Sequence, residues 1–236
     1  MCYSFESSLT SWFAILLSAM YLMANGKRDP VANRTDVWIA LFVLTFGQIQ
    51  LIEAMLWNEI RAPVPDKRKI AQLTSYIPIL LWAQPTIQCV GAYYATGDER
   101  LLYAGFVYLV ILLWQWATTR ATRFDTVVGD NGHLVWCRYD GADADNTQRV
   151  SILGGSGVTA TVLALLYAGG LLAPLLFMPN HVLGTTLLVY GIGSFVYAWA
   201  VAGPEYASYW CYLAVGYAVV AIVLGTFTTP GTTPKS

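Results

Sequence analysis

Charged residues are scarce in this chain: 13 Lys and Arg and 14 Asp and Glu make up only 11% of its 236 residues. In a soluble domain roughly a quarter of the residues are charged. Hydrophobic residues reach 56%, and the mean hydropathy is +0.52. The scarcity of charge argues against an ordinary soluble domain and predicts an integral membrane protein whose first partner is the lipid bilayer.

Several other absences narrow the function. No Lys/Arg-rich run exists and the net charge is −1, so nucleic acid is not an expected partner. Four cysteines without a CxxC pair argue against both a disulfide scaffold and a structural zinc site. No Lys lies within an apolar run, which excludes a retinal Schiff base, and the two histidines, His133 and His181, are expected at opposite ends of the spans. We therefore predict no metal and no cofactor.

Long apolar runs recur along the chain, each long enough as a helix to cross a hydrocarbon layer about 30 Å thick. Strand-like alternation is absent from these windows, which argues against a transmembrane barrel. The runs predict a single all-α integral membrane domain over residues 1–236, a bundle of seven transmembrane helices. The expected spans are Leu9–Asn25, Val37–Trp57, Ile70–Ala95, Leu101–Thr118, Ile152–Phe177, Val182–Ala202 and Tyr206–Phe227.

The connection over residues 119–151 is the one sizeable segment expected outside the membrane. Its HLVWCRYDG run, between the turn signals DNG and YDG, predicts either a small hairpin or an ordered loop on the lipid headgroups. The last residues, 228–236, contain two prolines and are expected to form a flexible tail.

Orientation follows from the basic residues near the spans. The first apolar run has Glu6 in place of a basic segment, so we expect a permanent span and not a cleaved signal peptide. The end with the N-terminus carries Arg61, Lys67, Arg68, Lys69, Arg120, Arg123, Arg138 and Arg149, and the other end carries Lys27, Arg28, Arg34, Arg100 and Lys235. Eight basic residues against five favour a cytosolic N-terminus and an outer C-terminus.

Most polar and thiol groups near the spans are expected at one end of the bundle. With seven spans, alternate connections share an end with the N-terminus. This end collects Cys2, Glu53, Trp57, Gln115, Trp136, Cys137, Glu205, Ser208, Trp210 and Cys211.

Glu53 is the sharpest candidate for a functional group. In QIQLIEAMLW it shares a helix face with Gln50 and Trp57, about 6 Å inside the expected end of its span. The helix dipole and lost hydration disfavour a carboxylate there, so Glu53 should be protonated or have a donor partner. An acid at this depth is a functional candidate. The alternative is a structural residue that locks this helix to a neighbour.

The last span opens with GPEYASYWC, where Glu205 fits the positive end of the helix dipole and ordinary helix-start chemistry explains it. Ser208 and Cys211 lie three residues apart and can point into the bundle. Cys211 is either part of a thiol cluster or disulfide with Cys2 and Cys137, or an inert packing residue. A disulfide would require a lumenal end.

A deeper polar locus lies in the third span, where Gln84 and Gln88 are one turn apart and Pro78 and Pro85 remove backbone donors. Such groups at mid-membrane suit a substrate or ion path. Glutamine-mediated helix packing is the alternative.

Aromatic residues near the span ends are expected to act as interfacial anchors. Trp57, Trp136 and Trp210 would form an aromatic lid or anchor at the end with the N-terminus. We expect the residues MCYSFE to fold against this end as an ordered lid.

Four motifs together resemble an uncharacterised family of multi-pass membrane proteins encoded mainly by large DNA viruses of algae and protists. They are MCYS at the N-terminus, QLIEAMLW, GHLVW and SYWC, and the resemblance spans nearly the whole chain. It implies no activity. It implies that six residues belong to one recurring constellation: Cys2, Glu53, Trp57, Trp136, Trp210 and Cys211.

A second likeness, to the sugar and PQ-loop carriers, rests on seven helices and a kinked proline. Here the order is Gln84-Pro85, and the last span has no matching Pro-Gln pair.

The leading functional hypothesis is a small-solute or ion permease in which Glu53 is a proton- or cation-linked acid and Gln84 and Gln88 line the path. One alternative is a non-catalytic structural or assembly protein of a viral or host-derived membrane. Another is an intramembrane thiol or lipid-modifying enzyme, which lacks an evident acid-base partner, so an enzyme is the less favoured class. The sequence leaves the substrate and any homo-oligomer undetermined.

Overall fold

The computed structural model describes residues 4–24, 29–119, 122–140, 148–151, 158–202 and 206–227. The helices are α1 (Phe5–Ala24), α2 (Pro30–Ile60), α3 (Lys67–Thr96), α4 (Glu99–Thr119), α5 (Val158–Leu172), the 3₁₀ helix η1 (Ala173–Phe177), α6 (His181–Ala202), α7 (Tyr206–Leu213) and α8 (Val215–Phe227). The strands are β1 (Arg123–Val128), β2 (Leu134–Asp140) and β3 (Gln148–Ser151). The fold is a helical bundle with one small sheet, which the predicted all-α class did not require.

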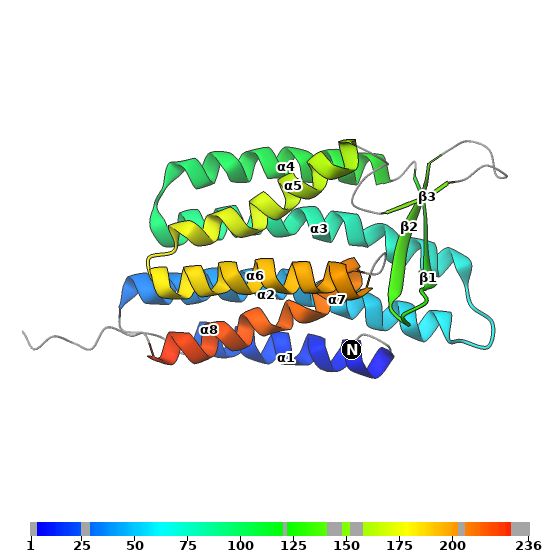
Figure 1. The fold of residues 1–236 in the computed structure, drawn as a ribbon, viewed down its shortest axis with the longest axis horizontal. Coiled ribbons are helices and arrows are strands. Elements are labelled where there is room, and N and C mark those ends of the chain that lie inside the picture. The colour runs from blue at the N-terminus through cyan, green and yellow to red at the C-terminus, as the bar shows by residue number, and fades with distance from the viewer. Residues whose placement is uncertain are drawn as a thin grey trace, which may run out of the picture.

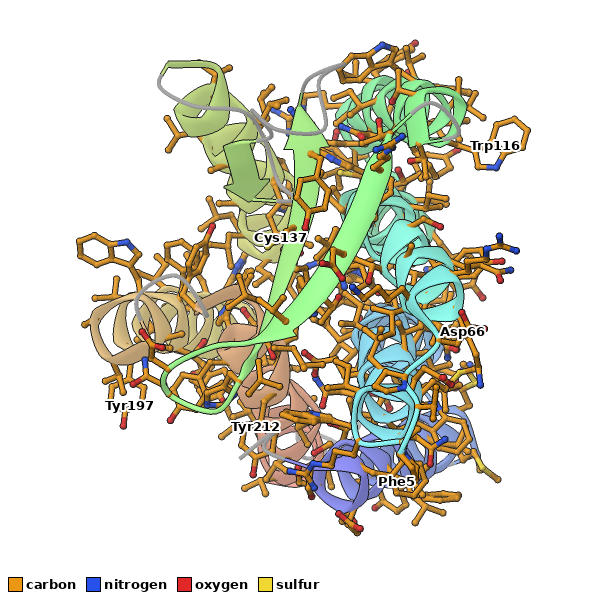
Figure 2. The ribbon with its side chains drawn as sticks, turned by 90° about the vertical axis from the view of Figure 1, so that its right-hand side faces the viewer. Phe5, Asp66, Trp116, Cys137, Tyr197 and Tyr212 are labelled. Carbon is orange, nitrogen blue, oxygen red and sulfur yellow. The ribbon has the colours of Figure 1, made fainter. Side chains whose placement is uncertain are left out.

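The helices lie along one axis in two layers (Figures 1 and 2). Helices α1, α2, α3 and α4 follow one another side by side, each packed on the next. Helices α5, α6 and α7–α8 form the second layer, in which α5 packs on α3 and α8 packs on α1 and α2. Successive passes run in opposite directions. The start of α1, the α2–α3 turn, the sheet and the start of α7 therefore share one end, which we call the sheet end.

Among the described residues, five segments are long and apolar enough to cross a membrane: α1, α2, α4, α6 and the combined α7–α8 pass over Tyr206–Leu224. Helix α3 is more polar, since it includes Gln72, Gln84 and Gln88 as well as a basic first turn. The α5–η1 pass contains a shorter apolar stretch, Val162–Phe177. The bundle is thus compatible with an integral membrane protein.

Side chains and glycine set the helix boundaries. Asp29 caps α2 by accepting a hydrogen bond from the Val31 amide, and Asp66 caps α3 by accepting from Arg68 and Lys69 amides. Gly97 ends α3 with a left-handed φ of 75°, a conformation that favours glycine.

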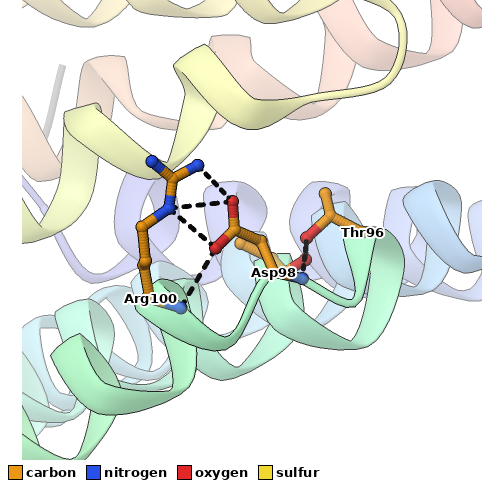
Figure 3. A network of polar contacts seen from close by, with 4 residues as sticks. Thr96, Asp98 and Arg100 are labelled. Carbon is orange, nitrogen blue, oxygen red and sulfur yellow. Dashed lines mark hydrogen bonds and ion pairs between the residues drawn. The ribbon is translucent and has the colours of Figure 1, made fainter.

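A compact polar turn joins α3 to α4 at the end opposite the sheet (Figure 3). The Arg100 guanidinium donates to the Asp98 carboxylate at 2.6 Å, and the Asp98 amide donates to the Thr96 hydroxyl. The hydrogen bonds from Arg100 lower the pKa of Asp98. Arg100 also lies over the Phe177 ring at 5.1 Å, so this turn contacts η1 of the second layer.

Two predicted single spans are interrupted in the structure. Within Ile152–Phe177 the described helix α5 begins at Val158 and changes to the 3₁₀ helix η1 at Ala173. Pro174 has no amide hydrogen to continue the α-helical pattern. Within Tyr206–Phe227 the helix breaks at Ala214, where the Tyr217 amide donates to the Ala214 carbonyl, three residues back.

The segment between α4 and α5 contains a three-stranded antiparallel sheet in the order β1–β2–β3. The HLVWCRYDG run, predicted to form a hairpin or a loop, supplies only the central strand β2 of this sheet. Strand β2 pairs with β1 and with β3. The β1–β2 turn includes Gly132, with a φ of 76°. The hydroxyls of Thr126 in β1 and Thr74 in α3 are hydrogen bonded at 2.6 Å, which ties the sheet to the bundle.

The two layers approach closely at Gly170 of α5. A Cβ at this position would lie 2.7 Å from the Pro85 Cβ and would also overlap the Tyr108 ring. The adjacent Gly169 has no atom within 4 Å of the corresponding position. Two neighbouring glycines therefore differ completely in their surroundings.

We expect Gly170→Ala to lower the free energy of unfolding by about 1–3 kcal/mol, because α5 must move away from α3 and α4. The matched variant Gly169→Ala should be neutral or stabilising by up to about 1 kcal/mol, since alanine is the better helix former. Unfolding in detergent micelles compares the two. Equal effects of both substitutions would contradict the packing described for α5.

Candidate functional site

A buried polar cluster joins α2 to α7 and contains three of the residues singled out in the sequence. Glu53 is fully buried, and its carboxylate accepts hydrogen bonds from the Ser208 hydroxyl and, at 3.1 Å, from the Gln50 amide. Gln50 is one turn earlier on α2, and Ser208 is in the first turns of α7. Hydrogen bonds of this kind satisfy the oxygens of a buried carboxyl group.

Glu53 lies further from the end of its helix than the sequence indicated. Helix α2 continues to Ile60, seven residues beyond Glu53, which corresponds to about 10 Å at 1.5 Å per residue. The last turn of the helix is therefore separated from the carboxylate, and the partners of Glu53 come from side chains. Cys211 follows Ser208 by one turn on α7 and is also buried.

Gln84 belongs to a different contact, between α3 and α5. Its carbonyl oxygen accepts a hydrogen bond from the Tyr167 hydroxyl. Its amide nitrogen is buried and has no hydrogen-bond partner among the described residues. Trp82 and Trp210 both place their rings edge-on to Tyr167, at 5.9 and 6.2 Å. Gln84 is thus half satisfied inside an aromatic environment.

Gln88 connects three helices. Its carbonyl oxygen accepts from the Trp38 indole at 2.8 Å, and its amide donates to the Leu171 carbonyl at 2.9 Å. The next carbonyl acceptor in this region is Gly170, which would bond to residue 174 in a continuous α-helix. Residue 174 is proline, and the Cys89 thiol lies 4.0 Å from the Gly170 carbonyl instead.

The carbonyl freed at the interruption between α7 and α8 also accepts a hydrogen bond from another helix. The Leu213 carbonyl would pair with the Tyr217 amide in a continuous helix, but that amide donates to Ala214. The Tyr190 hydroxyl of α6 donates to the Leu213 carbonyl at 2.6 Å. Both irregular passes are therefore supported by donors from other helices.

A small cavity lies beside Tyr167 of α5 and the first turns of α7. It measures about 20 Å³ and is lined by Tyr167, which bonds Gln84, and by Trp210 and Cys211, which follow Ser208 on α7. This volume suffices for about one water molecule. A polar cavity wide enough for a solute between Glu53 and Gln84 is not present among the cavities described.

The three tryptophans predicted as a lid or anchor are buried: Trp57, Trp136 and Trp210 are exposed by 2%, 4% and 3%. Trp57 packs under the Arg61 guanidinium, and the Trp210 indole donates to Ser194. The Trp136 indole nitrogen has no hydrogen-bond partner among the described residues. These side chains form part of the core and are not at the surface as expected for headgroup anchors.

The thiols that the structure describes do not form disulfides with one another. Cys89, Cys137 and Cys211 are buried, Cys137 in strand β2 and Cys211 in α7. A reactive thiol needs partial exposure. Cys2 and Glu205 lie outside the described residues, so the disulfides of Cys2 and the placement of Glu205 stay predictions. Of the predicted lid MCYSFE, Phe5 and Glu6 are described, and they form the start of α1.

Gln115 lies apart from Glu53, close to the sheet. It lines a cavity of about 190 Å³ together with Trp114, Thr118 and Arg138. A larger groove of about 1120 Å³ adjoins it, since Thr119, Thr122 and Phe124 line both. Within the described ranges, no group of three or more His, Cys, Asp or Glu side chains is arranged to hold a metal ion.

The sequence did not identify Tyr167, Trp38 or Tyr190 as partners of the polar groups. One signal was present: a tyrosine or tryptophan inside an apolar span needs a hydrogen-bond partner when buried. The identity of that partner depends on helix packing, which the sequence pattern does not specify.

No protein-family model, curated protein or solved structure matches this chain.

Ser208→Ala should lower the free energy of unfolding by about 1–3 kcal/mol, because it leaves one oxygen of a buried carboxylate without its donor. The matched control is Ser18→Ala, since the Ser18 hydroxyl makes an exposed hydrogen bond to the Ala14 carbonyl within its own helix. Its effect should be within about 0.5 kcal/mol of zero. Denaturant unfolding in micelles provides the comparison.

The pairing also predicts non-additivity. Combining Ser208→Ala with Glu53→Leu should destabilise the protein less than the sum of the two single effects, because the double variant leaves neither the carboxyl group nor the hydroxyl buried without its partner. Strict additivity would show that Glu53 and Ser208 do not act as a pair.

Proposed function

We propose that the chain is a seven-pass integral membrane protein with a closed interior and a non-catalytic binding or assembly role. Each side chain that would line a permeation path is hydrogen bonded across a helix interface, and this observation supports the proposal. Glu53 is bonded to Ser208, Gln84 to Tyr167, and Gln88 to Trp38 and Leu171. In this proposal the buried polar groups brace the two layers and the sheet end carries the binding surface.

All seven passes cross the membrane in the proposed topology, including α3 and α5–η1, which are less apolar or shorter than the other five. The buried positions of α3, between α2 and α4 and behind α5, support a spanning role for a helix with glutamines. The basic residues of the sheet end favour its placement in the cytosol. In this proposal the chain is a member of the viral membrane family that its motifs resemble.

A small-solute or ion permease is the second candidate. The small cavity lined by Tyr167, Trp210 and Cys211 favours it, since Tyr167 bonds Gln84 and the other two residues follow Ser208 on α7. In that case the structure corresponds to a closed state, and Glu53 exchanges its donors for a proton or a cation during transport. The thiol-enzyme hypothesis receives no support from the buried Cys137 and Cys211.

Labelling from both sides of the membrane tests the topology. Val64 in the α2–α3 turn is 85% exposed, and Glu99 at the start of α4 is also exposed. In a background without the native cysteines, Val64→Cys and Glu99→Cys should react with an impermeant maleimide from opposite sides. Reaction of both from the same side would show that α3 does not cross.

Flux measurements separate the two candidate functions. Proteoliposomes that contain the wild-type protein should show no proton, cation or sugar flux above that of empty liposomes, and Glu53→Gln should cause no change. A flux that Glu53→Gln abolishes would overturn the non-catalytic binding role in favour of the permease. Gln50→Glu, which adds a second acid beside Glu53, would then alter the pH dependence of that flux.

A further inference from the structure

The groove at the sheet end differs from the other cavities in its charge. It measures about 1120 Å³ and lies between the start of α3, the end of α4 and strand β1. Its lining includes three cationic side chains and one carboxylate: Lys67, Arg68, Arg123 and Asp125. The Asp125 carboxylate already accepts a hydrogen bond from the Tyr139 hydroxyl at 3.0 Å.

The three cations are available for a ligand. Within the part of the chain that the structure describes, the ion pairs involve Lys69 with Glu59 and Arg100 with Asp98, and none includes Lys67, Arg68 or Arg123. Three cations against one carboxylate in a concave lining leave an excess of positive charge, which attracts an anion. The arginine side chains also match the geometry of a phosphate group.

The remaining lining is amphipathic. The groove follows α3 from Lys67 to Ile79, which is about 18 Å at 1.5 Å per residue. Lys67 and Arg68 lie at the end of the helix, whereas Ala71, Tyr76 and Ile79 continue toward the middle of the bundle. Along α3 the charged side chains therefore lie at the start of the groove, and less polar surface follows them.

The flank beside the groove is suited to lipid. Trp116 of α4 lines the groove and is 49% exposed, and its side chain points away from the bundle (Figure 2). Leu113 and Val110 precede Trp116 on α4 at three-residue spacing and are also exposed. Tryptophan and tyrosine at the headgroup level with aliphatic residues below are typical of a membrane interface.

We propose that this groove binds the headgroup of an anionic phospholipid, with the phosphate held by Lys67, Arg68 and Arg123 and the acyl chains along α4. The proposal deepens the binding role proposed above and rests on it, because the groove must lie at the membrane surface. A cytosolic sheet end faces the leaflet that is richer in anionic lipids. A soluble phosphate compound would use the cations but not the apolar flank.

Native mass spectrometry of the full-length protein in detergent tests the proposal. Dioleoyl phosphatidylglycerol should be retained at lower concentration than dioleoyl phosphatidylcholine. The variant with Lys67→Gln, Arg68→Gln and Arg123→Gln should bind phosphatidylglycerol more weakly by roughly five-fold for each cation removed. Arg61→Gln is the matched control, since Arg61 lies near the same end but contacts Trp57 and does not line the groove. It should leave the preference intact.

Charge-conserving substitutions at the same three positions distinguish loss of charge from misfolding. The variant with Lys67→Arg, Arg68→Lys and Arg123→Lys should keep the preference for phosphatidylglycerol. Equal retention of the two lipids by the wild type, or a preference that survives the triple Gln variant, would overturn the proposal. Binding of glycerol 3-phosphate as tight as that of the lipid would also overturn it, because the acyl chains would then contribute nothing.

The two proposals fail separately. Loss of the lipid preference with two-sided cysteine labelling intact would refute the groove assignment alone. Labelling of Val64→Cys and Glu99→Cys from one side would refute the seven-pass topology, whatever the lipid measurements give.

Discussion

Hydrogen bonding of carbonyls inside an apolar bundle is the constraint on which this structure depends. A helix interruption frees carbonyl groups, and without water each freed group costs several kcal/mol unless a donor is provided. Within the described helices, one pass is interrupted at Pro174 and another at Ala214, and in both the freed carbonyls face donors from neighbouring helices. Gln88 and Cys89 supply the first site, and Tyr190 supplies the second.

The same requirement explains how the two layers are held together. The apolar surfaces of the helices do not specify a partner in a lipid environment, where the hydrophobic effect between helices is weak. Polar contacts, and glycines that allow two helices to approach closely, do specify which helices pack together. The contacts of Glu53 with Ser208, Gln84 with Tyr167, and Gln88 with Leu171 each join a helix of the first layer to one of the second. Gly170 permits the close approach of α5 to α3 and α4.

The sequence predicted the existence of the helices better than their continuity or their contacts. Hydropathy identified every helical pass, because apolar length is a property of each segment alone. It did not reveal the break at Ala214, since no proline or charge marks that position. Glu53, Gln84 and Gln88 could be singled out because a polar group in an apolar run needs a partner. Their partners could not be named, because Tyr167 and Trp38 become neighbours only through packing. The sheet was uncertain for the same reason, as the pairing of β2 with β1 and β3 depends on segments with weak patterns of their own.

The distance along the chain between Glu53 and Ser208 has a consequence for biosynthesis. The serine follows the acid by 155 residues, and at about 5–20 residues per second the ribosome needs roughly eight to thirty seconds to produce it. During that interval α2 contains an acidic side chain whose final donor does not yet exist. Gln50, three residues before Glu53 on the same helix, is already present and bonds the second carboxylate oxygen. The nascent helix thus already contains one hydrogen-bond partner for Glu53 before Ser208 is synthesised.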